Sequence, residues 1–330
     1  MRQRIQAFSL TDTGRKRKEN QDFCAVFSKG DALLMVVADG VGGHKCGDVA
    51  SRLAVETLRR MFNETEIEDP RDFFEHAIQK ANQEVRNYIE ATPSCKGMAT
   101  TFTAVIIRNS TLTLLHVGDS RAYLLRKGRF QRLTEDHTLV RRMMQEGVLS
   151  PEEAKTHPKR HIIVNAVGIA PIQEFDLRQM ELQVGDKILL CSDGLYDEVS
   201  EREIAKILEE NSPKEAVRKL VETANEAGGK DNISVTLAVM EGSALMNTKH
   251  FETSVASTPL ASRRLKKVFF ILILLVLGCG GIGYWSRTTD TGRRLKARVL
   301  SFFRKGSVFC EKAIHLNKGQ SEKGKGFHDN

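Results

Sequence analysis

Apolar residues along this chain follow two different periods, and each period predicts a different kind of element. Strand-like runs cover residues 3–10, 24–39, 100–108, 111–117, 122–126, 130–133, 175–182, 187–192 and 233–240. The i, i+3, i+4 spacing of amphipathic helices begins at Val49 and recurs over Pro70–Ala91, 201–210 and 213–227. The order is strands, two helices, strands, two helices and a last strand. It predicts an α+β fold with the helices outside a sheet core.

Residues 138–172 are the least regular part of this region. The run that begins at Ser150 and Pro151 and continues with Glu152 and Glu153 is typical of a helix start, and a polar patch follows at 157–161. Such a segment is either a mobile flap over a site or a plain surface excursion.

The pattern changes at Ser243. Residues 243–267 form a polar and then basic linker, and residues 268–285 are eighteen residues without a charge, flanked by aromatic side chains. We interpret 268–285 as a single transmembrane helix, because a buried helix in a globular domain is rarely apolar on every side. Basic residues lie on both sides of it, so the charge rule for membrane proteins does not fix its orientation. Residues 286–330 are a basic tail, whose role stays open.

Charge and cysteine content limit the compartments and partners. From Ser243 onward there are sixteen Lys/Arg against five Asp/Glu, out of 50 and 42 in the whole chain, which leaves residues 1–242 mildly acidic. The basic tail lacks zinc-finger spacing and interleaved aromatic residues, so we expect a membrane surface as its partner and no nucleic acid. The N-terminus does not have the pattern of a secretory signal, and the six cysteines have no metal-site spacing. We therefore expect a cytoplasmic domain at 1–242 with reduced cysteines.

An aspartate-glycine pair ends two of the apolar runs, at Asp39-Gly40 and at Asp193-Gly194. One such pair is usually only a turn, but two in like context suggest strand ends that deliver oxygen ligands to one place. Aspartates without histidine or cysteine partners favour magnesium or manganese. Two such ions make a bound water nucleophilic, which is the chemistry of a hydrolase.

Eight short motifs occur in the same order in a known family. They are 17–22 (RKENQD), 37–44 (VADGVGGH), 47–51 (GDVAS), 97–101 (GMATT), 117–121 (VGDSR), 133–137 (LTEDH), 191–194 (CSDG) and 231–233 (DNI). In these motifs the chain resembles the bacterial protein phosphatase 2C-type, metal-dependent serine/threonine phosphatases over about residues 5–240. The resemblance implies a four-layer α-β-β-α sandwich.

The resemblance also implies a dinuclear manganese or magnesium site. Asp39 would bridge the two ions, the Gly40 carbonyl would contact one, Asp193 and Asp231 would complete the ligands, and Asp22 would act through water. The catalytic residues would then be Arg17, Asp39 and Asp193, and the bridging water would attack phosphorus directly.

Further residues complete or depart from the family pattern. Arg17 would hold the phosphoryl oxygens, and Asp119 would belong to a third metal position, with an acidic flap residue such as Glu153 as a further ligand. Val41 stands where eukaryotic members carry a histidine proposed as general acid, so a water or another group must protonate the leaving oxygen. We interpret His44 as a cap or packing residue rather than as that acid.

The sequence thus predicts a membrane-anchored protein phosphatase that hydrolyses phosphoserine and phosphothreonine in a bacterial cytoplasm. Its partners would be phosphorylated proteins and a serine/threonine kinase whose action it opposes, and its catalytic domain would be a monomer. A different two-metal hydrolase is one alternative, although such enzymes usually use histidine ligands. The other is a catalytically silent scaffold that binds phosphoproteins at the membrane.

Overall fold

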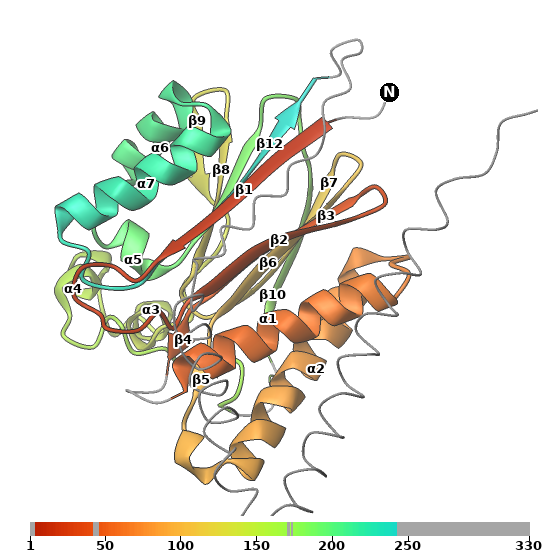
Figure 1. The fold of residues 1–330 in the computed structure, drawn as a ribbon. Helices are drawn as coiled ribbons and strands as arrows, with labels where there is room; N and C mark the ends of the chain where they lie inside the picture. Colours follow the sequence, from red (N-terminus) through yellow and green to blue (C-terminus); the bar gives the residue numbers. More distant parts are fainter. Residues whose placement is uncertain (1–3, 42–45, 170–171, 173, 243–330) are drawn as a thin grey trace, which may run out of the picture. The chain divides into compact units, whose positions relative to one another are not determined.

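Two five-stranded antiparallel sheets form the centre of the molecule (Figure 1). The structure, a computed structural model, describes residues 4–41, 46–169, 172 and 174–242. The first sheet has the strand order β1 (Arg4–Asp12), β12 (Ile233–Glu241), β11 (Lys187–Cys191), β8 (Arg121–Arg126) and β9 (Arg129–Arg132). The second has the order β10 (Asp176–Glu181), β7 (Thr111–Val117), β6 (Phe102–Arg108), β3 (Ala32–Ala38) and β2 (Phe23–Lys29).

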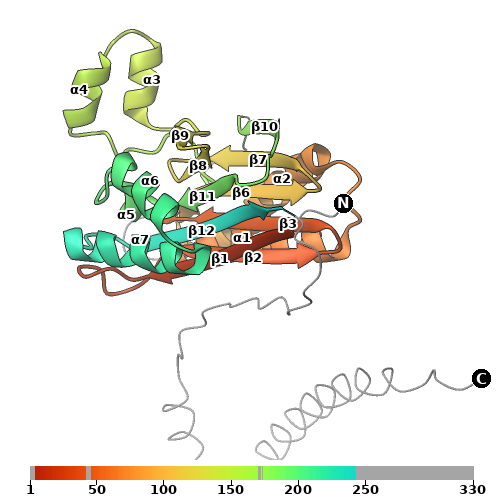
Figure 2. The same cartoon turned by 90° about the horizontal axis from the view of Figure 1, so that it is seen from above.

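Helices cover the outer face of each sheet (Figures 1 and 2). Helices α1 (Gly47–Glu64) and α2 (Pro70–Ala91) pack on the second sheet, where α2 begins at Pro70 after an Asp69 side chain that accepts a hydrogen bond from the Arg71 amide. Helices α5 (Asp193–Tyr196), α6 (Glu201–Glu210) and α7 (Pro213–Ala227) pack on the first. The predicted α+β fold is therefore confirmed, and its layers follow the order α-β-β-α.

The position of strand β3 between two apolar cores explains why its sequence is apolar throughout. All seven residues of β3 are buried. Leu34 and Val36 belong to the core under α1 and α2, whereas Leu33, Met35 and Val37 belong to the core between the two sheets. Because successive side chains of a strand point to opposite faces, a strand between two cores has no position left for a polar residue.

The prediction of one strand over residues 24–39 was wrong. The segment is a hairpin in which β2 and β3 pair in antiparallel register, with Phe23 opposite Ala38 and Lys29 opposite Ala32. Gly30 turns the chain with φ of +61°, a value that glycine adopts without steric cost. The short polar break at residues 28–31 is the signal that distinguishes this hairpin from a long strand.

Residues between β9 and β10 leave the sandwich as a separate excursion, which contains α3 (Leu139–Gln145) and α4 (Pro151–Thr156) and extends beyond the sheets in Figure 2. The predicted helix start is confirmed. Ser150 Oγ accepts a hydrogen bond from the Glu153 amide, and the Glu153 carboxylate accepts one from the Ser150 amide at 2.9 Å.

The prediction that all cysteines are reduced was wrong for two of them. Cys46 and Cys95 form a disulfide across a sequence separation of 49 residues. The fold brings the start of α1 beside the short 3₁₀ turn Pro93–Cys95, which no local cysteine spacing could indicate. Cys24 and Cys191 are free and lie in the sandwich, while Cys279 and Cys310 lie outside the described residues.

The predicted transmembrane helix at 268–285, the linker before it and the basic tail after it also lie outside the described residues. Within the part of the chain that the structure describes, no helix is both long enough and apolar enough to cross a bilayer.

Candidate active site

The strand ends that carry the predicted aspartates meet in one cavity of about 740 Å³. Asp39 follows β3 of the second sheet, whereas Asp193 follows β11 and Asp231 precedes β12 of the first. The cavity lies where the two sheets present these ends together. Of the predicted site residues, it is lined by Arg17, Asp39, Gly40, Asp119, Asp193 and Asp231.

The backbone of Asp39 is held on both sides by threonines of one neighbouring segment. Its amide donates to Thr101 Oγ1 at 2.9 Å, and its carbonyl accepts from the Thr101 amide and from Thr100 Oγ1, both at 2.9 Å. The next residue, Gly40, packs so tightly that a Cβ there would lie 2.2 Å from the Gly47 carbonyl oxygen. Only glycine fits this turn, and the Asp39 side chain is left free to face the cavity.

Asn232 fixes the loop that carries Arg17. Its side chain accepts a hydrogen bond from the Gln21 amide at 2.8 Å and donates to the carbonyls of Thr13 and Glu19 at 2.9 and 3.0 Å. Arg17 then reaches across the cavity, with its Nη2 atom 2.5 Å from Asp231 Oδ2. The arginine and the carboxylates that the sequence placed far apart therefore share one opening.

Asp22 takes a different position from the other carboxylates. It does not line the cavity but lies buried, with 6% of its surface exposed, and accepts a hydrogen bond from Ser192 Oγ at 2.6 Å. Ser192 immediately precedes Asp193, so Asp22 supports the backbone that presents that carboxylate. Its predicted contact with metal through water stays a prediction.

Burial and mutual repulsion make these carboxylates difficult to ionise. Burial, followed by the neighbouring aspartates, raises the pKa of Asp39 and of Asp193 well above the ordinary range. Burial also raises the pKa of Asp119 to about 7 and that of Asp22 to about 6. A polyvalent cation in the cavity would remove this repulsion.

Two unpaired carboxylate oxygens also favour a bound cation. Within the described residues, the buried Oδ1 atoms of Asp119 and Asp193 have no hydrogen-bond partner. An unpaired buried oxygen is costly unless a donor or a metal ion satisfies it. The predicted ligands Asp39, Gly40, Asp119, Asp193 and Asp231 would all offer carboxylate or carbonyl oxygens, which suit magnesium or manganese.

The flap residue Glu153 is not brought to this site. Its carboxylate caps α4 through the Ser150 amide and hydroxyl, and Glu153 is absent from the residues that line the cavity. Glu153 therefore caps α4 in this structure, and its assignment as a further metal ligand stays a prediction. The capping pattern that predicted the helix already accounts for its side chain.

His161 also reaches the site; the sequence left its polar patch open as either a flap that touches substrate or a solvated surface loop. Its Nδ1 atom lies 3.8 Å from Asp197 Oδ2, and one ligand atom from each of His161, Asp193 and Asp197 lies within 4.8 Å of the others. The polar patch 157–161 was visible in the sequence, but its approach to α5 depends on how the excursion folds back. His44, the other histidine considered, lies outside the described residues.

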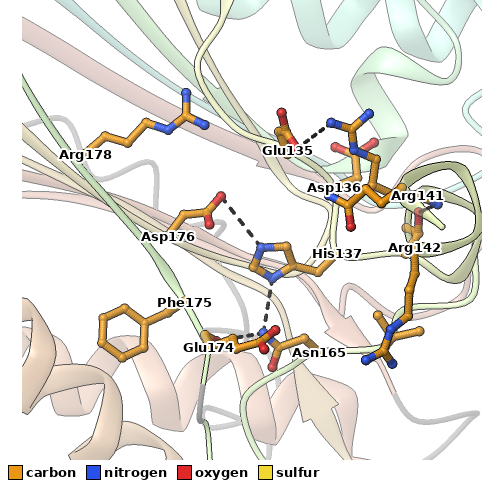
Figure 3. A pocket seen from close by; sticks show the side chains of 13 residues that line it. Glu135, Asp136, His137, Arg141, Arg142, Asn165, Glu174, Phe175, Asp176 and Arg178 are labelled. Atoms are coloured by element: carbon orange, nitrogen blue, oxygen red, sulfur yellow. Dashed lines mark hydrogen bonds and ion pairs between the residues drawn. The ribbon is translucent and has the colours of Figure 1, made fainter.

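A larger cavity of about 970 Å³ lies at the base of the excursion (Figure 3). His137 is at its centre, where Nδ1 accepts a hydrogen bond from the Gly118 amide at 3.3 Å and Nε2 faces Asp176 Oδ2 at 3.7 Å. Three of the four carboxylates here have basic partners: Arg141 binds Glu135, Arg121 binds Asp136, and His137 faces Asp176. Such neutralised acids do not form a metal site, so the smaller cavity is the candidate active site.

Arg121 lies behind the candidate active site, where it positions Tyr196 of α5. Its guanidinium binds Asp136 through two hydrogen bonds of 3.0 and 2.7 Å and lies 3.6 Å from the centre of the Tyr196 ring. Tyr196 in turn donates its hydroxyl proton to the Asp119 carbonyl at 3.0 Å. The pair therefore positions α5 against the loop that carries Asp119.

Replacement of Arg121 by alanine is expected to lower the free energy of unfolding by about 3 kcal/mol. It leaves the mostly buried Asp136 carboxylate, 16% exposed, with only the more distant Arg132 as a basic partner. Asp31→Ala is the control, since it removes the exposed pair with Arg108, which should cost less than about 1 kcal/mol. Urea unfolding of both variants measures the difference. Equal losses would contradict the supporting role of Arg121.

Comparison with known proteins gives consistent matches over the described region. The family model Protein phosphatase 2C matches residues 13–238. The serine/threonine phosphatase stp of Listeria innocua is 39% identical over 233 residues, which cover 69% of this chain and 92% of that protein. The structure of the S. agalactiae serine/threonine phosphatase has 36% identity and a TM-score of 0.68, and the match covers 72% of this chain and 100% of that one.

A third match bears on the metal. The catalytic domain of the serine/threonine protein phosphatase PstP in complex with two manganese ions has 34% identity and a TM-score of 0.64. That match covers 72% of this chain and 99% of the PstP domain. The similarity thus extends to a protein whose structure contains the cation that the oxygen ligands described above would suit.

Proposed function

This chain belongs to the protein phosphatase 2C family and is a metal-dependent serine/threonine phosphatase, and from this premise we propose its cellular role and its mechanism. We propose that it removes phosphate from phosphoserine and phosphothreonine of cytoplasmic bacterial proteins and so opposes serine/threonine kinases. Residues 268–285 would anchor it in the cytoplasmic membrane as a single-pass protein. The observation that carries the proposal is the convergence of Arg17 with the four predicted aspartates Asp39, Asp119, Asp193 and Asp231 in one cavity.

In this proposal each carboxylate has a distinct task. Asp39 and the Gly40 carbonyl would hold two manganese or magnesium ions together with Asp193 and Asp231, and Asp119 would serve a third position. When bound, the ions would lower the pKa of a shared water and so supply the nucleophile that attacks phosphorus directly. The unpaired Oδ1 atom of Asp193 supports its place among the ligands.

Arg17 would bind and orient the phosphoryl group. About half of its side chain is exposed, and its guanidinium lies at the cavity beside Asp231. Guanidinium groups bind phosphate oxygens through paired hydrogen bonds, so Arg17 can exchange its contact with Asp231 for contacts with the substrate. Val41 lines the cavity and cannot transfer a proton, so the leaving oxygen must take its proton from water or another group.

Phosphate release from a phosphothreonine peptide tests the proposal directly. The full-length chain in detergent is expected to release phosphate with Mn²⁺ or Mg²⁺ and to stop when EDTA is added, whereas Asp193→Ala should stay inactive at all metal concentrations. Release by the variant at the unmodified rate would refute the assigned ligand set. Protease digestion of the tail 286–330 from outside sealed cells tests the membrane span, because access from outside requires that the chain cross the bilayer.

A further inference from the structure

The disulfide between Cys46 and Cys95 lies beside the active site. Cys46 immediately precedes α1, whose first residue Gly47 packs against Gly40. Cys95 ends the 3₁₀ turn that leads into the small strand β5 (Ala99–Thr100), and β5 pairs with β4 (Gly40–Val41). The two sulfur atoms therefore join the two segments that lie on either side of Gly40.

The start of α1 and the segment 95–101 also hold the turn at Asp39 and Gly40 in place. On one side, Thr100 and Thr101 bind the backbone of Asp39. On the other, the Gly40 amide and the Ser51 hydroxyl of α1 both donate to the Gln21 carbonyl, at 3.1 and 2.6 Å. Any separation of the start of α1 from the 95–101 segment would loosen the setting of Asp39 and Gly40 together.

We propose that the Cys46–Cys95 disulfide is a reversible redox switch that controls the affinity of the neighbouring site for its divalent cation. The oxidised form holds Asp39 and Gly40 in position and binds the cation tightly. The reduced form allows α1 to move away from the 95–101 segment and binds the cation more weakly. This inference rests on the proposed function only in treating Asp39 and Gly40 as metal ligands.

The backbone conformation of Cys46 favours movement of the start of α1 once the disulfide is reduced. Cys46 has φ of +68°, in the left-handed region that a residue with a Cβ adopts at a cost. Within the described residues, the free cysteines are poor candidates for the same role, because burial raises the pKa of both Cys24 and Cys191 to about 12. The thiolate is the reactive form, so these two stay unreactive.

The exposures of the two cysteines indicate the order of the chemical steps. Cys95 is buried, with 4% of its surface exposed, whereas Cys46 is partly exposed at a helix N-terminus, a position that favours the thiolate. With a small-molecule disulfide as oxidant, the Cys46 thiolate attacks one sulfur and expels one thiolate. The Cys95 thiolate then attacks the Cys46 sulfur and expels the second. Two protein thiols lose two electrons and two protons, and the oxidant becomes two thiols.

The proposed cytoplasmic location indicates when the disulfide would form and when it would be reduced. In reducing compartments, disulfides are usually transient and serve catalysis or redox sensing, so a pair in a cytoplasmic domain would close under oxidising conditions and open when reductant is restored. The phosphatase would then bind its divalent cation more tightly under oxidising conditions than under reducing ones.

Metal binding under controlled redox conditions tests the switch. The full chain with Cys279→Ser and Cys310→Ser is equilibrated with oxidised or reduced dithiothreitol, thiols are counted by labelling, and Mn²⁺ affinity is measured by calorimetry. We expect reduction to weaken Mn²⁺ binding about tenfold, within the usual range of coupling between sites. The same chain with Cys95→Ser should bind Mn²⁺ as weakly as the reduced form and ignore the redox state. Cys24→Ser, the matched control, should respond like the parent chain.

Equal Mn²⁺ affinity in the oxidised and the fully labelled reduced protein would overturn the switch, and so would tighter binding after reduction. The reduced parent chain provides this result even if Cys95→Ser does not fold. Because thiol labelling and metal binding do not depend on catalysis, the proposed function is judged separately, from phosphate release in the same samples.

Discussion

Replacement of Asp39 by asparagine is expected to lower kcat/KM for a phosphothreonine peptide by more than about 100-fold, because loss of even an outer partner of a metal site costs roughly 10- to 100-fold. Besides burial, Asp22, Asp193, Asp119 and Asp231 all raise the pKa of Asp39, so its charge interacts with each of the other carboxylates. The amide keeps the shape of the side chain but removes the negative charge that would hold the cation. Steady-state kinetics at saturating Mn²⁺ measures the loss.

The same substitution should stabilise the protein in EDTA. Without metal, the Asp39 carboxylate is buried among Asp22, Asp119, Asp193 and Asp231, and asparagine removes one member of this repulsive group. We expect the melting temperature in EDTA to rise by a few degrees, since about 1 kcal/mol shifts it by roughly 2–4 °C in a domain of this size. Asp31→Asn, at an exposed ion pair, is the control: it should leave kcat/KM unchanged and should not raise the melting temperature in EDTA. A variant that lost stability in EDTA would show that repulsion is not the dominant effect.

The second large effect is a loss of stability of the metal-free protein between about pH 4 and pH 7. The folded protein raises the pKa of Asp22 from 3.8 to about 6 and that of Asp119 from 3.8 to about 7. A carboxyl with a raised pKa in the fold stabilises it fully below the pKa of the unfolded chain and loses this contribution as pH rises through the folded value. For Asp22 alone the difference amounts to about 3 kcal/mol.

Urea unfolding in EDTA at successive pH values measures this decline. Two groups with a lowered pKa act in the opposite direction: the half-buried Asp176 beside His137 below about pH 4, and His116, whose pKa burial lowers from 6.5 to about 4, between those two values. The raised pKa values of four carboxyls, those of Asp22, Asp39, Asp119 and Asp193, outweigh this single histidine. Stability should therefore peak near the acid end, fall towards pH 7 and recover when Mn²⁺ is added. Asp119→Asn should flatten the profile between pH 5 and pH 7. A stability that rises steadily to pH 7 in EDTA would contradict the raised pKa values.

The sequence was a good guide to the elements because their patterns are local. Strand β3 has an unbroken apolar run because it lies between two cores, and α2 has the proline start and the apolar stripe that predicted it. The hairpin at Gly30 was missed because both of its strands are apolar, so hydrophobicity alone hides the turn. Turn residues, rather than hydrophobicity, mark such a boundary.

The site was predictable in its residue types but not in its geometry. The Asp-Gly pairs indicated hard metal ligands, and Arg17 indicated phosphate through the family resemblance. Neither indicated that His161 would approach Asp197, or that Cys46 would meet Cys95. These contacts join segments far apart in the chain, and their distances depend on loop paths that leave no periodic signal.

The division of the proposed metal ligands between the two sheets affects the distance between them. Asp39 follows a strand of one sheet and Asp193 a strand of the other, so the apolar layer between them, which includes Met35, Val105 and Leu190, determines how far apart the two carboxylates stand. Interiors are close-packed and resist compression, so this layer acts as a spacer of fixed thickness. Side-chain volume deep in the sandwich therefore sets the separation of the two carboxylates, and a core substitution that leaves the fold intact would change that separation from a distance.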